Sequence, residues 1–255
     1  MAAIAYPPNS PHHPHRALVN CVYLWGLRLS RASNGQIFKD QEEAIGGRID
    51  RYLQVQPSNS GSDLEKALQI VQAEVLLATY LFSCGRALEG GYHVNAAVSM
   101  ATMYGMHCLV PQGGSSVQGT RTTSTNTTVD QERVRVFWQV FFLDRCWAIA
   151  NNSPALMRDD GQLRIAIRTP WPTESGSYES SNVNIYLNCF HRADCILKQF
   201  PISTNPPQGA HTIQDFLAGE QVGGTSAQAL ICKAVLWAEQ AARLASQRTS
   251  GEDTE

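Results

Sequence analysis

Hydrophobic residues recur at helical spacing along most of this chain, and polar stretches separate the apolar segments. Apolar residues spaced i, i+3, i+4 and i+7 are typical of a helix with one buried face. No segment alternates apolar and polar residues between hairpin turns, so no strand is predicted. The pattern predicts an all-α fold, an irregular multi-helix array without a sheet, with helices over residues 16–29, 37–55, 64–81, 89–108, 130–150, 182–200 and 226–245.

Short polar motifs mark the predicted ends of these helices. Ser33-Asn34-Gly35 predicts a turn that closes the first helix. Ser62, with Glu65 three residues later, predicts a capping box for the third helix. Asp130 is the predicted N-cap of the aromatic helix, which the Asn151–Pro154 segment ends. The third and fourth helices are close in sequence and rich in small residues, which predicts an αα-hairpin.

The composition predicts one helical domain with polar ends. Residues 1–15 are rich in Pro and His and are expected to be a disordered tail. A single domain is predicted over residues 16–246, interrupted by a flexible Gly/Ser/Thr loop at 111–129 and a Pro-rich break at 201–209. Residues 247–255 are expected to form a polar tail.

Charge and cysteine content narrow the possible classes of function. The formal net charge is −2 and the arginines are scattered, so the sequence offers no basic surface for nucleic acid. Seven widely spaced cysteines predict free thiols in a reducing compartment. The N-terminal sequence does not resemble a signal peptide, and no segment has the ~20 apolar residues that span a bilayer. A soluble intracellular protein without a membrane partner is therefore predicted.

Two groups of His and Cys residues could ligate a metal, and each also has a structural explanation. The first group lies in the His-Pro tail, for which disorder is the favoured explanation. In the second group one His and one Cys share a helical face, but zinc would need a fourth ligand, so packing of buried thiols is favoured. No metal site is therefore predicted at His12, His13 and His15, or at Cys189, His191 and Cys195.

Charged pairs offer the remaining candidate chemistry. Asp159-Asp160 has no further carboxylate nearby to hold magnesium, so a capping or loop role is favoured. Asp144-Arg145 lies inside an apolar helix, where charges are buried only when they are paired. Arg145 could bind a carboxylate of Asp159, Asp160 or another helix. A buried pair that joins two helices is favoured over contact with an effector ligand. No P-loop, nucleophile elbow or His-Glu helix motif is present, so no catalytic residue is predicted.

The order of motifs between Glu132 and Pro172 resembles a known family. An Arg-Val-Phe-Trp motif is followed by an Asp-Arg dyad, a small-residue-Pro segment, an acidic pair and a Pro-containing close. This order resembles the middle homology region of fungal zinc-cluster (Zn2Cys6) transcription factors, and the surroundings of Trp171 are most similar to basidiomycete members. The resemblance is strong over residues 15–172 and rests on Arg133–Trp138, Phe141–Arg145, Asn152–Leu156 and Asp159–Asp160, with His15–Ser30, Gly85–Gly90 and Tyr104–His107 upstream.

The resemblance implies a nuclear, non-enzymatic regulatory domain of a transcription factor. Its implied partners are the transcription machinery or regulatory proteins, and a small-molecule effector is a candidate. Family members bind DNA through six closely spaced cysteines that hold zinc. Here the closest cysteines are Cys189 and Cys195, so zinc and DNA contacts are expected only in a module outside this sequence, and no cofactor is expected within it. A truncated gene, a lost cluster and a domain that acts alone are the three explanations.

Two other functions stay open. One is an all-α enzyme or cofactor-binding protein, whose distinguishing feature would be a pocket where Arg145, His107 or His191 converge with carboxylates. The other is a decoy that lacks a DNA-binding module and pairs with full-length relatives. Co-purification with such a relative would distinguish the decoy.

The low net charge and the missing cysteine cluster predict that the purified chain does not retard DNA in a gel at physiological salt. Without a basic surface, no release of counterions drives nucleic-acid binding. A salt-sensitive shift of random-sequence DNA would contradict this expectation.

Overall fold

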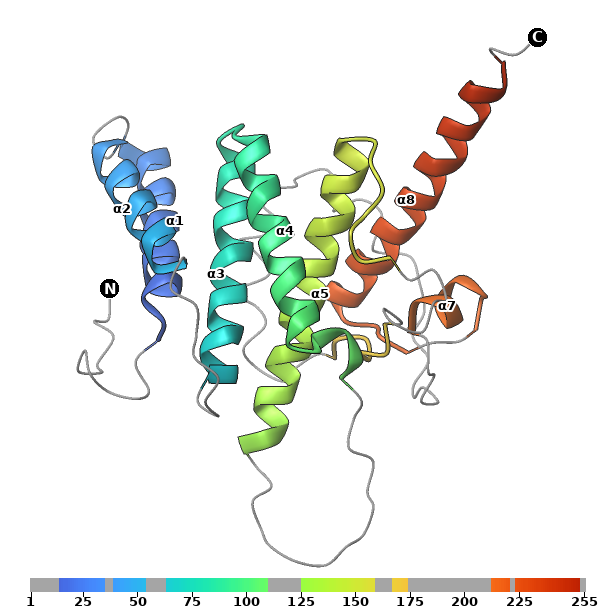
Figure 1. Cartoon of the computed structure of the whole chain (residues 1–255), viewed down its shortest axis with the longest axis horizontal. Coiled ribbons are helices and arrows are strands. Elements are labelled where there is room, and N and C mark those ends of the chain that lie inside the picture. Colours follow the sequence, from blue (N-terminus) through green and yellow to red (C-terminus); the bar gives the residue numbers. More distant parts are fainter. Residues whose placement is uncertain are drawn as a thin grey trace, which may run out of the picture. The chain divides into compact units, whose positions relative to one another are not determined.

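The structure, a computed structural model, describes residues 14–34, 39–53, 63–109, 125–158, 167–173, 212–220 and 223–252 (Figure 1). Within these ranges it contains seven α-helices, one short 3-10 helix and no strand, which confirms the all-α prediction. None of these helices is long and apolar enough to cross a membrane. The elements are α1 (Arg16–Asn34), α2 (Lys39–Leu53), α3 (Asp63–Ser83), α4 (Ala87–Met103), η1 (Met106–Cys108), α5 (Thr125–Ala150), α7 (Thr212–Leu217) and α8 (Ala227–Glu252).

The chain separates into two compact units, residues 1–100 and 101–255. The prediction of a single domain over residues 16–246 stays a prediction. The predicted helix at 182–200, the Pro-rich break at 201–209 and the Ser62 cap lie outside the described residues, as do residues 1–13 of the predicted tail.

In the first unit, α1 packs against both α2 and α3. The apolar stripe of α1 forms this core because its members recur every three or four residues and face one side. Directional bonds fix the register: the Cys21 thiol donates to the Ala73 carbonyl at 3.4 Å, and the Trp25 indole N–H donates to the Leu76 carbonyl at 3.0 Å. The residue numbers of the donors on α1 and of the acceptors on α3 increase together, so α1 runs parallel to α3. The buried core consists of Ala17, Cys21, Leu24, Trp25, Ile49, Ala73, Leu77, Tyr80 and Leu81.

The predicted hairpin of α3 and α4 is confirmed. Gly85 ends α3 in the left-handed region, with φ +75°. The Gly85 N–H donates to the Phe82 carbonyl and the Arg86 N–H to the Leu81 carbonyl, which is a Schellman motif. Glu74 of α3 then contacts His93 Nδ1 of α4 at 2.6 Å, so the two helices lie side by side. The residues of α4 predicted to face inward are buried: Val94, Ala97, Val98, Ala101 and, beyond the helix, Met106.

The end of α1 and the start of α5 differ from the prediction. The predicted turn at Ser33-Asn34-Gly35 begins later than expected, because Ser33 and Asn34 still belong to α1, and Gly35 lies outside the described residues. Asp130 does not cap the aromatic helix, because α5 begins at Thr125, inside the predicted 111–129 loop. Adding residues to an existing helix costs little compared with starting one, so the polar segment extends the apolar one.

Two further boundaries differ from the prediction, and one short helix was not predicted. The helix predicted to reach Cys108 ends at Met103, and a separate 3-10 helix follows. The short α7 was not predicted, because six residues are too few for a periodic pattern. α8 continues through much of the predicted polar tail to Glu252.

In the second unit, α5 and α8 lie side by side (Figure 1). Aromatic side chains contact one another beside these helices. Trp138 of α5 is fully buried and stacks on Trp171, with ring centroids 4.2 Å apart and an interplanar angle of 18°. The indole N–H of Trp138 donates to the Pro170 carbonyl at 2.7 Å. The Thr-Pro-Trp-Pro segment, residues 169–172, is thus part of the core.

The start of α8 is fixed by a side-chain cap. The Ser226 hydroxyl donates to the Pro172 carbonyl at 2.6 Å and accepts the Ala229 N–H at 3.2 Å. Lys233 donates to the carbonyls of Gly223 and Gly224 at 2.8 and 2.9 Å, and its ammonium lies 5.0 Å from the Trp171 ring centroid. The first turns of α8 are therefore tied to the segment that carries the tryptophan stack.

Replacing Gly224 by Ala should lower the free energy of unfolding by about 3 kcal/mol or more. Gly224 has φ +84°, and an added Cβ would collide with the Cβ and ring of Trp171. Gly219→Ala is the matched control, since Gly219 has φ +80° but no atom within 4 Å of an added Cβ. It should cost about 1 kcal/mol, from the backbone alone. Urea denaturation of both variants measures the difference, and equal losses would contradict the packing argument.

Candidate functional site

Asp144 holds the segment after α5 against the helix. α5 ends at Ala150, and Asn152 adopts the left-handed conformation with φ +48°, which reverses the chain. The returning segment places two backbone N–H groups over Asp144, whose oxygens accept from Leu156 at 3.0 Å and from Met157 at 2.9 Å. Asp144 is 1% exposed, so these bonds replace its hydration.

Arg145 joins three segments of the second unit. Its guanidinium donates through Nη1 to Oε1 of Glu239 in α8 at 3.2 Å and through Nη2 to the Met157 carbonyl. It also lies over the Phe141 ring, 4.7 Å from the centroid. The prediction that Arg145 binds a carboxylate of another helix is confirmed by this contact. Asp159 and Asp160, the other predicted partners, lie outside the described residues.

Burial acts on both members of the Asp144-Arg145 dyad. Burial raises the pKa of the Asp144 carboxyl, and the two backbone N–H donors and Arg145 oppose that rise. Burial lowers the pKa of Arg145, while the charges of Glu239 and Asp144 raise it. The ordinary pKa of a guanidinium is so high that Arg145 remains charged at neutral pH.

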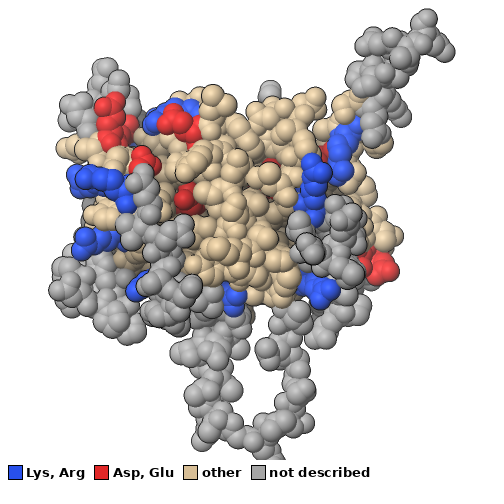
Figure 2. Space-filling view, in the orientation of Figure 1, with Lys and Arg blue, Asp and Glu red and all other residues tan. Residues whose placement is uncertain are grey.

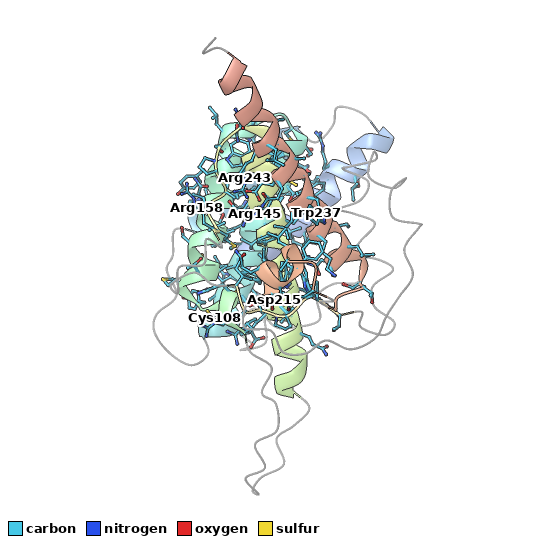
Figure 3. All side chains as sticks on the ribbon, turned by 90° about the vertical axis from the view of Figure 1, so that its right-hand side faces the viewer. Cys108, Arg145, Arg158, Asp215, Trp237 and Arg243 are labelled. Carbon is cyan, nitrogen blue, oxygen red and sulfur yellow. The ribbon has the colours of Figure 1, made fainter. Side chains whose placement is uncertain are left out.

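A cavity of about 500 Å³ opens beside this dyad. It lies between the end of α5, the returning segment, α7 and α8. Figure 3 shows the side chains of Arg145, Arg158 and Arg243 near one another, and Figure 2 shows Lys and Arg side chains gathered beside α8. The charged residues that line the cavity are Arg145, Arg158, Glu239 and Arg243. The apolar residues that line it are Ala148, Ile149, Pro154, Ala155, Ile213, Leu217, Leu236 and Ala242.

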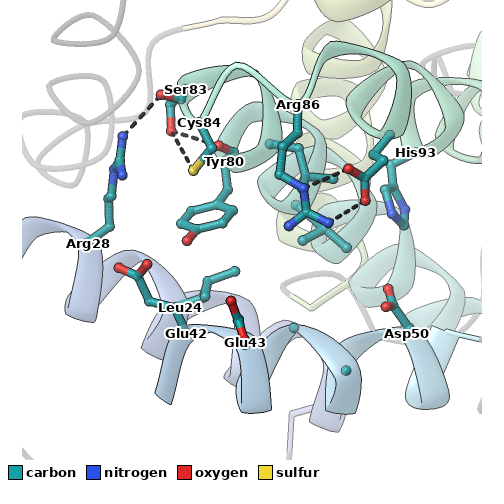
Figure 4. Close-up of a pocket in the computed structure, with 15 residues that line it drawn as sticks. Leu24, Arg28, Glu42, Glu43, Asp50, Tyr80, Ser83, Cys84, Arg86 and His93 are labelled. Atoms are coloured by element: carbon teal, nitrogen blue, oxygen red, sulfur yellow. Dashed lines mark hydrogen bonds and ion pairs between the residues drawn. The ribbon is translucent and has the colours of Figure 1, made fainter. Parts of the chain in front are cut away.

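A second cavity, of about 490 Å³, lies within the first unit (Figure 4). Its charged side chains largely engage one another or the backbone. Arg86 binds Glu89, with an Nε to Oε1 distance of 2.7 Å, and Arg28 donates to the Ser83 carbonyl at 3.0 Å. Burial raises the pKa of the Tyr80 phenol at the wall of this cavity. The contacts explain how the α3 to α4 turn is held and point to no reaction.

Among the histidines and cysteines considered as metal ligands, only His15 lies within the described residues. The backbone N–H of His15 donates to the Gln69 side chain at 2.5 Å, and its ring accepts the Ala17 N–H at 3.3 Å, so His15 helps to start α1. Burial lowers the pKa of His15, and the charge of Lys66 adds to this. No described group of three His, Cys, Asp or Glu residues could hold a metal ion. His12, His13, Cys189, His191 and Cys195 lie outside the described residues.

His107 does not line the cavity beside Arg145. Its backbone carbonyl accepts the N–H groups of Arg168 and Thr169 at 2.8 and 3.2 Å. Burial lowers the pKa of its imidazole, whose Nδ1 is buried and makes no hydrogen bond with the described residues. Of the three residues named for an enzyme pocket, Arg145 meets a carboxylate in a cavity, that of Glu239, whereas His107 does not line it and His191 lies outside the described residues.

Sequence reasoning missed the residues that complete the site: Arg158, Glu239 and Arg243. Glu239 and Arg243 are four residues apart on α8 and form an ion pair at 3.4 Å. That spacing, visible in the sequence, could have indicated the pair. Nothing in the sequence connects Glu239 to Arg145, which lies 94 residues earlier.

A family model matches most of the chain. A sequence model described as "Fungal specific transcription factor domain" matches residues 5–208, which is more than three quarters of the chain. The matched region includes the Asp144-Arg145 dyad and both ends of the tryptophan stack. No curated protein and no solved structure matches the chain significantly.

Arg145→Leu should destabilise the fold by about 3–5 kcal/mol, because it removes the buried partner of Glu239 and the donor to Met157. Arg243→Leu removes the other partner of the same carboxylate, yet that side chain is 57% exposed. Its loss should cost less than about 1 kcal/mol. Chemical denaturation of the two variants measures the contrast. A small effect of Arg145→Leu would show that the buried contact does not hold α5 and α8 together.

Proposed function

The chain belongs to the fungal specific transcription factor domain family, and we propose that it is a regulatory domain that acts through contacts with other proteins. Membership implies a role in transcription regulation. The observation that carries the proposal is the extent of the family match, which runs from residue 5 to residue 208. We extend the proposal to a nuclear location and a non-enzymatic role, both typical of the family.

Exposed apolar side chains support the part of the proposal that concerns protein contacts. Leu88 and Tyr92 of α4 are 86% and 69% exposed and lie four residues apart, so they share one helical face. Neighbouring large apolar side chains that are exposed to solvent are typical of surfaces that bind another protein. This face of α4 is our candidate contact surface.

The proposal leaves recognition of DNA to a zinc-cluster module. The seven cysteines of these 255 residues are too widely spaced for such a cluster, and the net charge is −2. Under the proposal a small-molecule effector would change the regulatory state by binding one conformation better than another.

Fusion of the full chain to an unrelated DNA-binding domain tests the proposal. Expression of a reporter gene in a fungal cell should change several-fold relative to the DNA-binding domain alone. A double variant, Leu88→Glu with Tyr92→Glu, should abolish the change, because it adds two charges to the candidate surface. The matched control is Asn95→Glu on the same helix, where the residue is already polar and exposed.

The outcomes of this assay distinguish unfolding, the absence of a regulatory role and a wrong assignment of the contact surface. Equal protein levels and helical circular dichroism exclude unfolding as the cause of any loss. A folded fusion that changes expression in neither direction would contradict the regulatory role. A change that survives the double variant would contradict only the assignment of the α4 surface.

A further inference from the structure

The cavity beside Arg145 has an apolar wall and a cationic rim. Two of its apolar residues, Ile213 and Leu236, are 2% exposed. Two others, Ile149 and Leu217, are half-buried. These four residues come from α5, α7 and α8 and surround one side of a volume of about 500 Å³. Small-molecule sites typically have this size, with a mostly apolar lining and a few fixed polar groups.

Positive charge exceeds negative charge around this volume. Three guanidinium groups line the cavity, those of Arg145, Arg158 and Arg243, against the one carboxylate of Glu239. Asp144 adds a second carboxylate beside Arg145, but both its oxygens already accept backbone N–H groups. The described residues at the cavity therefore retain one positive charge in excess.

The buried base of the cavity is polar and rigid. Arg145 is fixed by Met157 and Glu239, with 6% of its side chain exposed. Its Nε, and Oε2 of Glu239, are buried and make no hydrogen bond with the described residues. Both side chains line the cavity, so its base is polar. Arg243 contacts only Oε1 of Glu239, and its exposed guanidinium can donate hydrogen bonds to a second carboxylate as well.

We propose that this cavity binds a small organic acid with an apolar body. Its carboxylate lies between Arg158 and Arg243, and its hydrocarbon part lies against Ile149, Ile213 and Leu217. Guanidinium groups match a carboxylate in shape and charge, whereas an ammonium group would meet the excess positive charge of the rim. The ligand bridges α7 and α8 to the end of α5, so occupancy favours the conformation in which these three elements are close.

This inference rests on the proposed function only in naming the chemical class of the effector. Binding is a property of the purified chain and does not need a reporter gene. A chain that binds the acid while its fusion leaves transcription unchanged would contradict the regulatory role and support the site. A fusion that changes transcription while the chain binds no acid would overturn the site alone.

Titration of the full chain with octanoate, 1-octanol and octylammonium tests the site, because the three probes share one hydrocarbon chain and differ in charge. Isothermal titration calorimetry should show octanoate binding about tenfold more tightly than octanol, the factor that one charge-assisted contact supplies. Octylammonium should bind least. Octanol binding as tightly as octanoate, or no octanoate binding by folded protein, overturns the proposal.

Variants locate the binding on the chain. Arg158→Gln and Arg243→Gln should each weaken octanoate binding about tenfold and leave octanol binding unchanged. Arg48→Gln, in an exposed position of α2 outside the cavity, is the matched control and should bind octanoate as the natural chain does. Ala242→Phe should fill the cavity and abolish binding, with circular dichroism to verify the fold. Equal weakening by Arg48→Gln would show non-specific charge attraction and overturn the site.

Discussion

The second unit depends on how the buried charge of Arg145 is satisfied. A guanidinium that leaves water must find acceptors, and here they are Glu239 of α8 and the carbonyl of Met157. Neighbouring Asp144 accepts the N–H of the same Met157, so the two charges of the dyad bind opposite sides of one peptide segment. Any other placement of α8 would leave one buried charge without its partner. The dyad thus selects one arrangement of three segments over its alternatives.

The stack of Trp138 on Trp171 complements this polar contact with an apolar one. It lies about two turns earlier on α5 than Arg145, and the Cys232 thiol of α8 donates to the Trp138 carbonyl at 3.5 Å. α8 therefore contacts α5 at two places: at the aromatic stack, through Cys232 and Trp138, and at the ion pair of Arg145 with Glu239. The cavity lies beside the ion pair, where several of the groups that line it are charged and cannot collapse into an apolar core.

The helices and the dyad could be predicted because their signals are local. The start of the first helix at Arg16 and the break at Asn152 depend on neighbours within a few residues, and the structure has both where they were predicted. The partner of Arg145 could be predicted as a carboxylate but not as Glu239, since only the packed fold brings positions 145 and 239 together. The start of α5 was misplaced because Asp130 has a strong capping preference, and extension of an existing helix outweighed it.

The parallel pairing of α1 and α3 has a consequence for how the first unit is made. Its bonds from the first helix to the third connect residues 51 to 55 positions apart, from His15 with Gln69 to Arg28 with Ser83. When α1 leaves the ribosome, these acceptors on α3 have not yet emerged from it. The apolar side of α1 can pack only against α2 until α3, which ends at Ser83, has also emerged. Its assembly is governed by distant contacts, which is slow for a helical protein.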